Sequence, residues 1–440
     1  MMSHNPSTAS IEAADAHEGE AARASHTAKP VALAVQQWSL DRLHPHPRNY
    51  RRHPDHQLGV LRESLRVHGQ QKPVVIMPDG TILAGHGLVE AARAEGWEQI
   101  GCHVYDGPYP EAFLAIDNRA SDLAEDDEEA LAILLRDLEV QDQLTAAGWG
   151  EDDLSELLLR LEVEEKRGRE EAFDADQAMA EAEQSAIGGP TRVQPGEIWA
   201  LGRHRLMCGD ATDADAMAML MAGGLARLVA CDPPYGVAYD GNAHRREHGG
   251  GIVYRSIIND DLDPSQLEAF LTEAFSAALP HVADDAAWYV WHASVTRPAF
   301  LAALSAVGVT VHQEIVWIKE NFQFSRSDYH WQHEPCLYGW RERHTFLGER
   351  NQSTVWQVAR QSGHQHPTTK PVELWERPIR NHLEPGQIVL DPFVGSGTAI
   401  IAAERTGACA RAMEIDPAYC DVALDRWERF AGKSGVRVDG

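Results

Sequence analysis

The sequence predicts an α/β protein whose larger part is a doubly wound, mostly parallel sheet. From residue 193 onward, short apolar runs of strand length alternate with Ala- and Leu-rich stretches of helix length. The expected strands cover 197–201, 228–231, 288–291, 314–318, 388–390 and 410–414, and two expected helices cover 266–280 and 398–406. This alternation favours parallel strands with helices on both faces. Sheets of this kind bind ligands beyond the carboxyl ends of their strands.

The N-terminal part of the chain predicts a second, smaller domain. Residues 1–33 are rich in small and polar side chains, so we expect a disordered tail. Over residues 34–119, a β-branched run at 73–76, a Pro-Asp-Gly turn and a helix near 84–92 predict a small α+β domain.

The segment between the two domains is expected to be helical and acidic. Leucines at helical spacing predict two helices over 120–165, with a break at Gly148-Trp149-Gly150. The charged residues 166–192 are typical of a linker. The larger domain then covers 193–434, followed by a tail at 435–440.

The composition narrows the possible functions. Much of the net charge of −28 comes from residues 120–190, which hold 22 acidic and 5 basic side chains, so the larger domain can still contact nucleic acid. The six cysteines form no C-x-x-C pair, so we expect no metal site. No run approaches the roughly 18 apolar residues of a membrane span. We therefore expect a cytoplasmic protein with no membrane partner.

A glycine turn predicts a cofactor site at one strand end. In the segment Asp391-Pro-Phe-Val-Gly-Ser-Gly-Thr398, two glycines let a ligand approach the backbone where a helix begins. Glu414 ends the next expected strand and is placed to accept hydrogen bonds from ribose hydroxyls. Ile400 replaces a third glycine, and no G-K-[ST] follows, so phosphate binding is disfavoured. The alternative is an ordinary glycine-rich turn of another doubly wound protein.

A second motif, Asp232-Pro233-Pro234-Tyr235, follows another apolar run. The Asp232 carboxylate and the Pro233 carbonyl can accept hydrogen bonds from the two hydrogens of an exocyclic amine. Tyr235 offers a flat face to a base that has left its duplex stack. Alignment of that amine with a methyl donor would contribute to the rate through positioning. Taken alone, the motif also fits a proline-rich exit from a strand.

The order of the two motifs, with the tetrad before the glycine turn, is typical of a known family. Residues 193–434 resemble the amino-methylating DNA methyltransferases of the permuted, β-type order, which have a Rossmann-like sheet. The segment from Gly196 to Asp210 resembles the family's opening segment, and His366-Pro-Thr-Thr-Lys-Pro371 resembles the one that closes over the methionine part of S-adenosylmethionine. An Asp-initiated tetrad in this order goes mostly with N6-adenine, whereas N4-cytosine enzymes more often begin with Ser.

The resemblance implies a set of site residues. The catalytic residues would be Asp232, Pro233, Pro234 and Tyr235. The residues expected to bind S-adenosylmethionine are Asp210, Thr368, Lys370, Asp391, Phe393, Gly395, Ser396, Gly397, Thr398, Glu414 and Asp416. Basic residues beside aromatic ones or in a glycine-rich loop are expected to contact DNA, and these are Arg245, Arg246, Arg326, Arg341 and Arg343. The alternatives for these two segments are a mixed surface hairpin and a surface insertion.

Residues 36–119 resemble the ParB/sulfiredoxin-like domain. The landmarks are Leu43–Tyr50, Gly69–Val75 and Gly85–Ala92. In that family the Gly-His stretch at a helix start binds a nucleotide phosphate or serves a proposed nuclease, and a helix N-terminus suits an anion. Leu88 stands where an arginine is usual, which argues against nucleotide hydrolysis and nuclease activity. We expect a domain that docks on DNA or dimerises, with His86 and Arg119 as its residues of interest.

The sequence therefore predicts a site-specific DNA methyltransferase that moves a methyl group from S-adenosylmethionine to N6 of a flipped adenine. N4-cytosine transfer is the alternative within the same class, and restriction–modification is the implied context. A different class also stays open, namely a ParB-like, nucleotide-gated DNA clamp or nuclease with a non-catalytic methyltransferase module. A homodimer is compatible with either hypothesis.

Overall fold

The computed structural model describes residues 33–124, 126–166, 173, 177–178, 191–237, 258–323, 328–358 and 370–438. The chain divides into two compact units. The first unit ends at Asp126 and also includes Gln143–Gly148. The second unit comprises Asp127–Asp142 and the chain from Trp149 onward.

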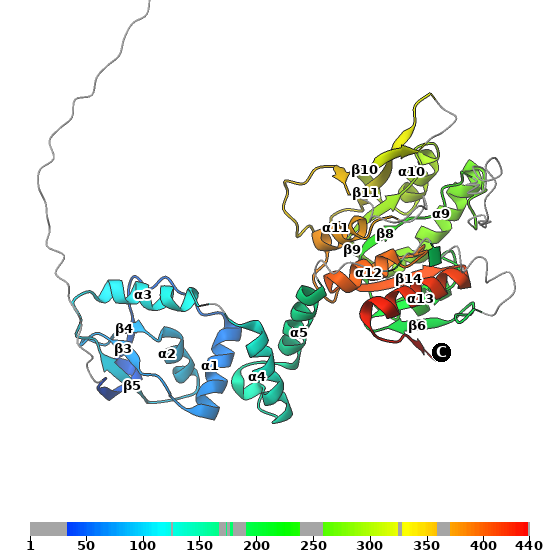
Figure 1. Cartoon of the computed structure of the whole chain (residues 1–440). Coiled ribbons are helices and arrows are strands. Elements are labelled where there is room, and N and C mark those ends of the chain that lie inside the picture. The colour runs from blue at the N-terminus through cyan, green and yellow to red at the C-terminus, as the bar shows by residue number, and fades with distance from the viewer. Residues whose placement is uncertain are drawn as a thin grey trace, which may run out of the picture. The chain divides into compact units, whose positions relative to one another are not determined.

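The first unit has a five-stranded sheet in the order β1-β5-β3-β4-β2. Figure 1 labels β3, β4 and β5 of this sheet. Its strands are β1 (Val35–Ser39), β2 (His44–Pro45), β3 (Val74–Ile76), β4 (Thr81–Ala84) and β5 (Gln99–Val104). Its helices are α1 (Asp55–His68), α2 (His86–Ala94) and α3 (Pro110–Asp122), with the short 3-10 turns η1 (Leu40–Arg42) and η2 (Thr145–Ala147). The strand, turn, strand and helix predicted between residues 73 and 92 are present as β3, β4 and α2.

Helix α2 begins where Gly85 adopts a left-handed conformation with φ of 93°. Glycine has no Cβ to penalise this conformation, so the chain can turn from β4 directly into the helix. The buried face of α2 includes Val89 and Ala92, which join Val74 and Ile82 of the sheet in one apolar core. This small core fixes the first unit.

Two helices at the start of the second unit confirm the predicted break at residues 148–150. Helix α4 (Glu128–Val140) begins at Asp127, whose side chain accepts a hydrogen bond from the backbone N–H of Ala130. Helix α5 (Glu151–Lys166) follows, and three acidic residues in its first turn suit the positive end of the helix dipole. Both helices bury one leucine-bearing face, through Leu135 and Leu157.

The second unit contains a ten-stranded sheet in the order β12-β10-β11-β9-β8-β13-β14-β7-β6-β15. The strands are β6 (Ile198–Leu201), β7 (His204–Cys208), β8 (Ala226–Cys231), β9 (Val282–Trp291), β10 (Thr310–Gln323), β11 (Trp331–Trp340), β12 (Val355–Gln357), β13 (Ile388–Asp391), β14 (Cys409–Glu414) and β15 (Val436–Val438). Strands β9, β8, β13, β14 and β7 are successive parallel neighbours. Strands β11 and β6 pair antiparallel with both of their neighbours.

Helices cover both faces of this sheet, as a doubly wound fold requires. Alternate residues of each strand point to opposite faces, so Leu228 and Ala230 enter one core while Val229 and Cys231 enter the other. The first core is covered by α11 (Glu373–His382), α12 (Thr398–Thr406) and α13 (Pro417–Ala431). The second is covered by α7 (Ala214–Met221), α9 (Pro264–Ala278) and α10 (Arg297–Ala306), with the 3-10 turn η3 (Leu279–His281) after α9.

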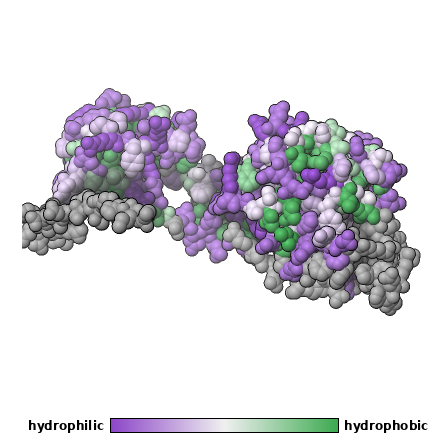
Figure 2. Space-filling view, turned by 90° about the horizontal axis from the view of Figure 1, so that it is seen from above, coloured by the Kyte–Doolittle hydropathy of each residue, from purple (hydrophilic) through white to green (hydrophobic). Residues whose placement is uncertain are grey.

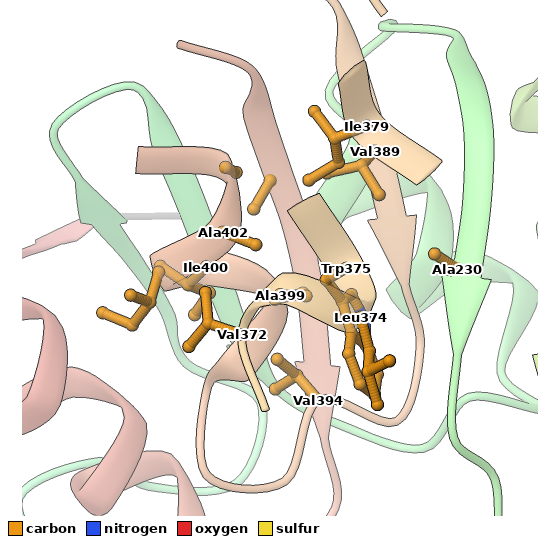
Figure 3. Close-up of a cluster of buried hydrophobic side chains, with 14 of the residues drawn as sticks. Ala230, Val372, Leu374, Trp375, Ile379, Val389, Val394, Ala399, Ile400 and Ala402 are labelled. Atoms are coloured by element: carbon orange, nitrogen blue, oxygen red, sulfur yellow. The ribbon is translucent and has the colours of Figure 1, made fainter. Parts of the chain in front are cut away.

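The close-up in Figure 3 shows part of the first core. Side chains of α11 and α12, such as Trp375 and Ile400, pack beside Val389 of β13 and Ala230 of β8. These contacts hold the start of α12 against the two strands that end at the predicted motifs. The predicted fold class is therefore confirmed, with a parallel centre and antiparallel strands toward the edges.

The surface of the described residues is mainly hydrophilic in Figure 2, with scattered hydrophobic groups on the second unit. Within the described ranges, no helix combines the length and the apolar character that a membrane crossing needs.

Candidate active site

The two predicted motifs lie at the same edge of the ten-stranded sheet. Strand β13 is parallel to β8 on one side and to β14 on the other. The carboxyl ends of neighbouring parallel strands open at a common edge. Asp232 directly follows β8, Asp391 is the last residue of β13, and Glu414 is the last residue of β14. Strand order therefore brings together residues that are far apart in the sequence.

Within the tetrad, the Tyr235 hydroxyl donates a hydrogen bond of 2.5 Å to Asp232 Oδ1. Burial, with the nearby Asp232 and Glu334 charges, raises the pKa of Tyr235 well above its ordinary value, so this hydroxyl stays protonated. The Tyr235 ring meets Phe300 edge-on, with 6.3 Å between centroids. These contacts fix the orientation of the carboxylate and of the ring together.

Asp260 holds the loop that carries the tetrad. Its Oδ1 accepts hydrogen bonds from the backbone N–H groups of Tyr235 at 2.9 Å and Gly236 at 3.0 Å. The residue is only 3% exposed. The sequence pattern does not predict this role for Asp260, because the residue follows a segment with no strand or helix signal and no motif.

Lys370 lies directly against the tetrad. Its ammonium donates hydrogen bonds to Asp232 Oδ2 and, at 2.8 Å, to the Tyr235 hydroxyl oxygen. It also forms an ion pair with Glu334 Oε2 at 3.1 Å. The resemblance implies Lys370 as a cofactor residue, whereas its described polar contacts are with the tetrad and with Glu334.

Glu334 of β11 connects Lys370 with a second lysine, Lys319 of β10. Burial alone would raise the pKa of Glu334, but the two ammonium groups lower it to about 2. Burial alone would likewise lower the pKa of Lys370, but Asp232 and Glu334 raise it above its ordinary value. Along the series Lys319, Glu334, Lys370 and Asp232 the charges alternate in sign. Each of these ions therefore lies beside a partner of opposite charge.

The glycine turn has the geometry that the sequence predicts. Gly395 and Gly397 have φ values of 52° and 86°. A Cβ on Gly397 would lie 3.0 Å from Ala423 Cβ of α13, so a larger residue there requires α13 to shift by a few tenths of an ångström. Among the described residues, no atom lies within 4 Å of a Cβ placed on Gly395, so they leave that side of the turn open.

Side chains of the turn are held by a buried arginine of α13. Arg426 Nη1 donates to the Ser396 carbonyl oxygen at 3.0 Å, to Ser396 Oγ at 3.2 Å and to Thr398 Oγ1 at 3.1 Å. Phe393 packs against the second core, 5.9 Å from Phe270 between ring centroids. Ser396 and Thr398, which are predicted cofactor residues, thus have a hydrogen-bond partner within the protein.

Two carboxylates flank this turn, Asp391, which is buried, and Glu414, which is half-buried. Asp391 accepts hydrogen bonds from the Phe393 N–H at 3.0 Å and from the Trp375 indole N–H at 3.3 Å. Glu414 accepts from the N–H groups of Gly395 at 3.0 Å and Asp416 at 2.9 Å. Despite these bonds, burial raises the pKa of Asp391 to about 8 and that of Glu414 to about 7.

In the part of the chain that the structure describes, neither Asp391 nor Glu414 forms an ion pair with a cationic side chain. A desolvated carboxylate without a counterion favours a ligand that brings a positive charge or hydroxyl donors. Asp210 follows β7, the parallel neighbour of β14, and accepts from Thr212 Oγ1 at 2.8 Å. The edge from Asp210 to Asp391 is therefore acidic and rich in acceptors.

Of the remaining predicted residues, only Arg341 and Arg343 belong to the part of the chain that the structure describes. Thr368, Arg245, Arg246 and Arg326 lie outside the described residues. Arg341 and Arg343 follow the last residue of β11, which runs antiparallel to β9, so they lie at the opposite edge of the sheet. Arg341 there forms an ion pair of 3.5 Å with Asp284. As DNA contacts, these arginines stay a prediction.

Comparisons with known proteins point to the same part of the chain. Residues 226–425 match a family model described as DNA methylase. A stretch is 31% identical over 145 residues to the type II methyltransferase M.Cfr9I of Citrobacter freundii, covering 28% of this chain and 46% of that protein. The type II methyltransferase M.XycI of Xanthomonas campestris pv. cyanopsidis is 33% identical over 145 residues, with the same coverage. The chain thus spans less than half the length of these curated relatives.

Among solved structures, the M1.HpyAVI–SAM complex aligns with 50% of this chain and 97% of its own chain, at 20% identity and a TM-score of 0.38. The family match and the two relatives support the expected DNA methyltransferase domain of the N6/N4 type. They do not separate adenine N6 from cytosine N4.

Proposed function

We propose that this protein is a DNA methyltransferase that transfers the methyl group of S-adenosylmethionine to N6 of adenine. The observation that carries the proposal is the shared sheet edge, where the Asp232–Tyr235 pair follows β8 and the acidic glycine turn follows β13. A base acceptor and a cationic methyl donor would each find a complementary group at this edge.

In this proposal the tetrad prepares the amine. The Asp232 side chain is 25% exposed, so a ligand can reach it. Its carboxylate and the Pro233 carbonyl would accept the two amine hydrogens, which favours a tetrahedral nitrogen with an available lone pair. The Tyr235 ring would stack on a base taken out of the duplex. Asp260 keeps this loop in place through the backbone of Tyr235 and Gly236.

The residues of the glycine turn fit S-adenosylmethionine. When bound, this cofactor supplies an electrophilic methyl group on a sulfonium. Asp391 and Glu414 form no ion pair with a cation of the described residues, and desolvation raises the pKa of both carboxylates. Ionic and hydroxyl groups of the cofactor would provide the missing partners, while the open side of Gly395 would allow close approach.

Labelled cofactor tests the proposal directly. The purified full chain is incubated with unmethylated DNA and methyl-tritiated S-adenosylmethionine, and the digested nucleosides are separated. N6-methyladenine is the expected product. Asp232→Ala should abolish transfer and leave cofactor binding by calorimetry intact, whereas the matched variant Asp284→Ala, at the other sheet edge, should behave like the wild type. Label that enters only RNA or protein contradicts the proposal.

N4-cytosine is the second candidate acceptor, since cytosine and adenine present the same exocyclic amine to Asp232. The same nucleoside separation decides between them, because N4-methylcytosine would be the labelled product. The Asp at the first tetrad position favours adenine through the resemblance described above.

For the first unit we propose a DNA-docking role related to the ParB-like domains. Leu88, at the position where the resemblance expects an arginine, packs against the apolar core and is partly buried. This favours an accessory role over nucleotide hydrolysis or DNA cleavage. CTP binding or DNA nicking that persists in Asp232→Ala would instead support the clamp or nuclease hypothesis.

A further inference from the structure

The position of the Lys370 ammonium suggests a second contact with the acceptor base, in addition to the contact proposed for Asp232. An ammonium group has three N–H donors and no acceptor. In the structure two of its acceptors are Asp232 Oδ2 and the Tyr235 hydroxyl oxygen, and Glu334 is its second anionic neighbour. Lys370 itself is only 6% exposed, and these three partners hold its ammonium beside the tetrad.

Asp232 and Lys370 together present an acceptor beside a donor. Because Nζ contacts Oδ2 directly, any base whose amine reaches Asp232 also lies within reach of the ammonium. A carboxylate oxygen can accept more than one hydrogen bond, so the amine does not have to displace Lys370. If Lys370 redirects its bond from Tyr235 to the base, the Tyr235 hydroxyl still has Asp232 Oδ1 as its partner.

We propose that Lys370 donates a hydrogen bond to the ring nitrogen next to the reactive amine, and that Glu334 is the positioning residue that holds it there. This inference rests on the proposed function. On adenine the ring nitrogen is N1 and on cytosine it is N3, and both are acceptors beside an amino donor. Guanine and thymine show the reverse pattern, with a carbonyl oxygen facing Asp232 and an N–H facing Lys370.

The same contact has a chemical consequence. The ring nitrogen of adenine or cytosine has a lone pair in the plane of the ring and is the more basic nitrogen, whereas the exocyclic lone pair is delocalised. A donated hydrogen bond engages the ring lone pair and leaves the amine as the site of transfer. Lys370 would thereby determine both which base is accepted and which of its nitrogens is methylated.

Substrates that lack the ring nitrogen test the contact in the unaltered protein. DNA in which the target adenine is 1-deazaadenine keeps the amine but has a C–H at position 1. We expect kcat/KM to fall about 10- to 100-fold, the range for one hydrogen bond to a charged group. DNA with 7-deazaadenine, altered away from this edge, should stay within about threefold of adenine. If cytosine is the labelled base, 3-deazacytosine takes the place of 1-deazaadenine.

Variants complete a double-mutant cycle. Lys370→Met should lose the discrimination between adenine and 1-deazaadenine, Lys370→Arg should retain part of it, and Lys433→Met, at an exposed surface lysine, should match the wild type. Glu334→Gln should reduce the discrimination while leaving cofactor binding unchanged. Calorimetry with the cofactor and a thermal melt confirm that each variant is folded.

The outcomes separate the two proposals. Absence of label on any DNA with the wild type overturns the proposed function itself. Methylation of adenine with equal rates on the 1-deaza and 7-deaza substrates overturns the role of Lys370 and leaves the proposed function standing. If 1-deazaadenine lowers kcat/KM by the same factor in the wild type and in Lys370→Met, the role of Lys370 is likewise overturned. The removal of the ring nitrogen and the removal of the ammonium would then act independently.

Discussion

His204 Nε2 of β7 lies 2.5 Å from Glu404 Oε2 of α12, and both side chains are buried. His204 Nδ1 accepts a hydrogen bond from the backbone N–H of Ala410, so Nε2 is the donor in the pair. Glu404 also accepts from the Trp427 indole at 3.1 Å and forms an ion pair with Lys166 at the end of α5. One carboxylate thus joins four elements of the second unit.

We expect Glu404→Ala to lower the free energy of unfolding by about 3–5 kcal/mol, because it leaves buried donors and a buried ammonium without their partner. Urea denaturation followed by circular dichroism measures the change. The comparison variant is Glu156→Ala on the exposed face of α5, whose ion pair with Arg160 is mostly solvated and should contribute less than about 1 kcal/mol. Similar values for both variants would contradict the structural role of Glu404.

Cofactor affinity should increase with pH. In the ligand-free protein the pKa of Asp391 is raised from 3.8 to about 8 and that of Glu414 from 4.5 to about 7. A cationic ligand requires the ionised forms, so binding below these values releases protons. The association constant should then rise by up to about tenfold per pH unit for each proton released, and level off above about pH 8.

The same two groups affect stability in the opposite sense. Because their folded pKa values are raised, the folded state holds these protons more tightly than the unfolded chain does. Their contribution to stability is present at low pH and is lost as the pH rises from about 4 to about 8.

Calorimetry in buffers of different ionisation enthalpy measures the protons released when the cofactor binds, and Asp391→Asn should release fewer protons than the wild type. A pH-independent affinity would argue against these carboxylates as cofactor ligands.

The two glycines of the turn should differ in the effect of an added methyl group. Gly397→Ala places a Cβ 3.0 Å from Ala423 and keeps a positive φ, so it should lower the melting temperature. The added methyl group of Gly395→Ala meets no atom of the described residues within 4 Å, so its cost in stability should be limited to about 1 kcal/mol of backbone strain. Its cofactor affinity should nevertheless fall, because the methyl group points into open space at the proposed site. Thermal melts with and without S-adenosylmethionine distinguish the two effects.

Asp260→Ala should reduce turnover and spare cofactor binding. The substitution removes the acceptor for two backbone N–H groups of the tetrad loop. A shift of about 1 Å in reacting groups costs on the order of 100-fold in rate, so we expect kcat to fall by about 10- to 100-fold. Asp261→Ala, at the adjacent exposed residue, is the matched control. Unchanged turnover in Asp260→Ala would show that the loop keeps its position by other contacts.

Much of the candidate site follows from the sequence because its residues stand at strand ends. Asp232, Asp391 and Glu414 each close a short apolar run, and the parallel connection of such runs brings their ends to one edge. The expected strand over 388–390 and the expected helix over 398–406 agree with β13 and α12. Local pattern and parallel topology were sufficient for these residues.

Glu334 and the position of Lys370 depend on pairings that the local pattern does not contain. Strand β11 enters the sheet antiparallel between β9 and β10, so Glu334 near its start lies at the edge of the tetrad, beside Lys370, and its last residues lie at the far edge. Because β11 runs antiparallel to its neighbours, Glu334 lies beside Lys370 and Arg341 lies at the opposite edge of the sheet. The sequence pattern gives the composition of this segment but not the direction in which it runs.

The pairing of the last strand with the first one of the larger domain has an evolutionary consequence. Strand β15 runs antiparallel to β6, and Val436 is the partner of Ala200, so the two ends of this domain are neighbours. A short peptide could join residue 438 to residue 191, and new ends could be opened upstream of Lys370, without altering a strand neighbour. In the resulting chain the glycine turn would precede the tetrad. Both motif orders are therefore compatible with the same strand neighbours, and this chain has the order in which the tetrad comes first.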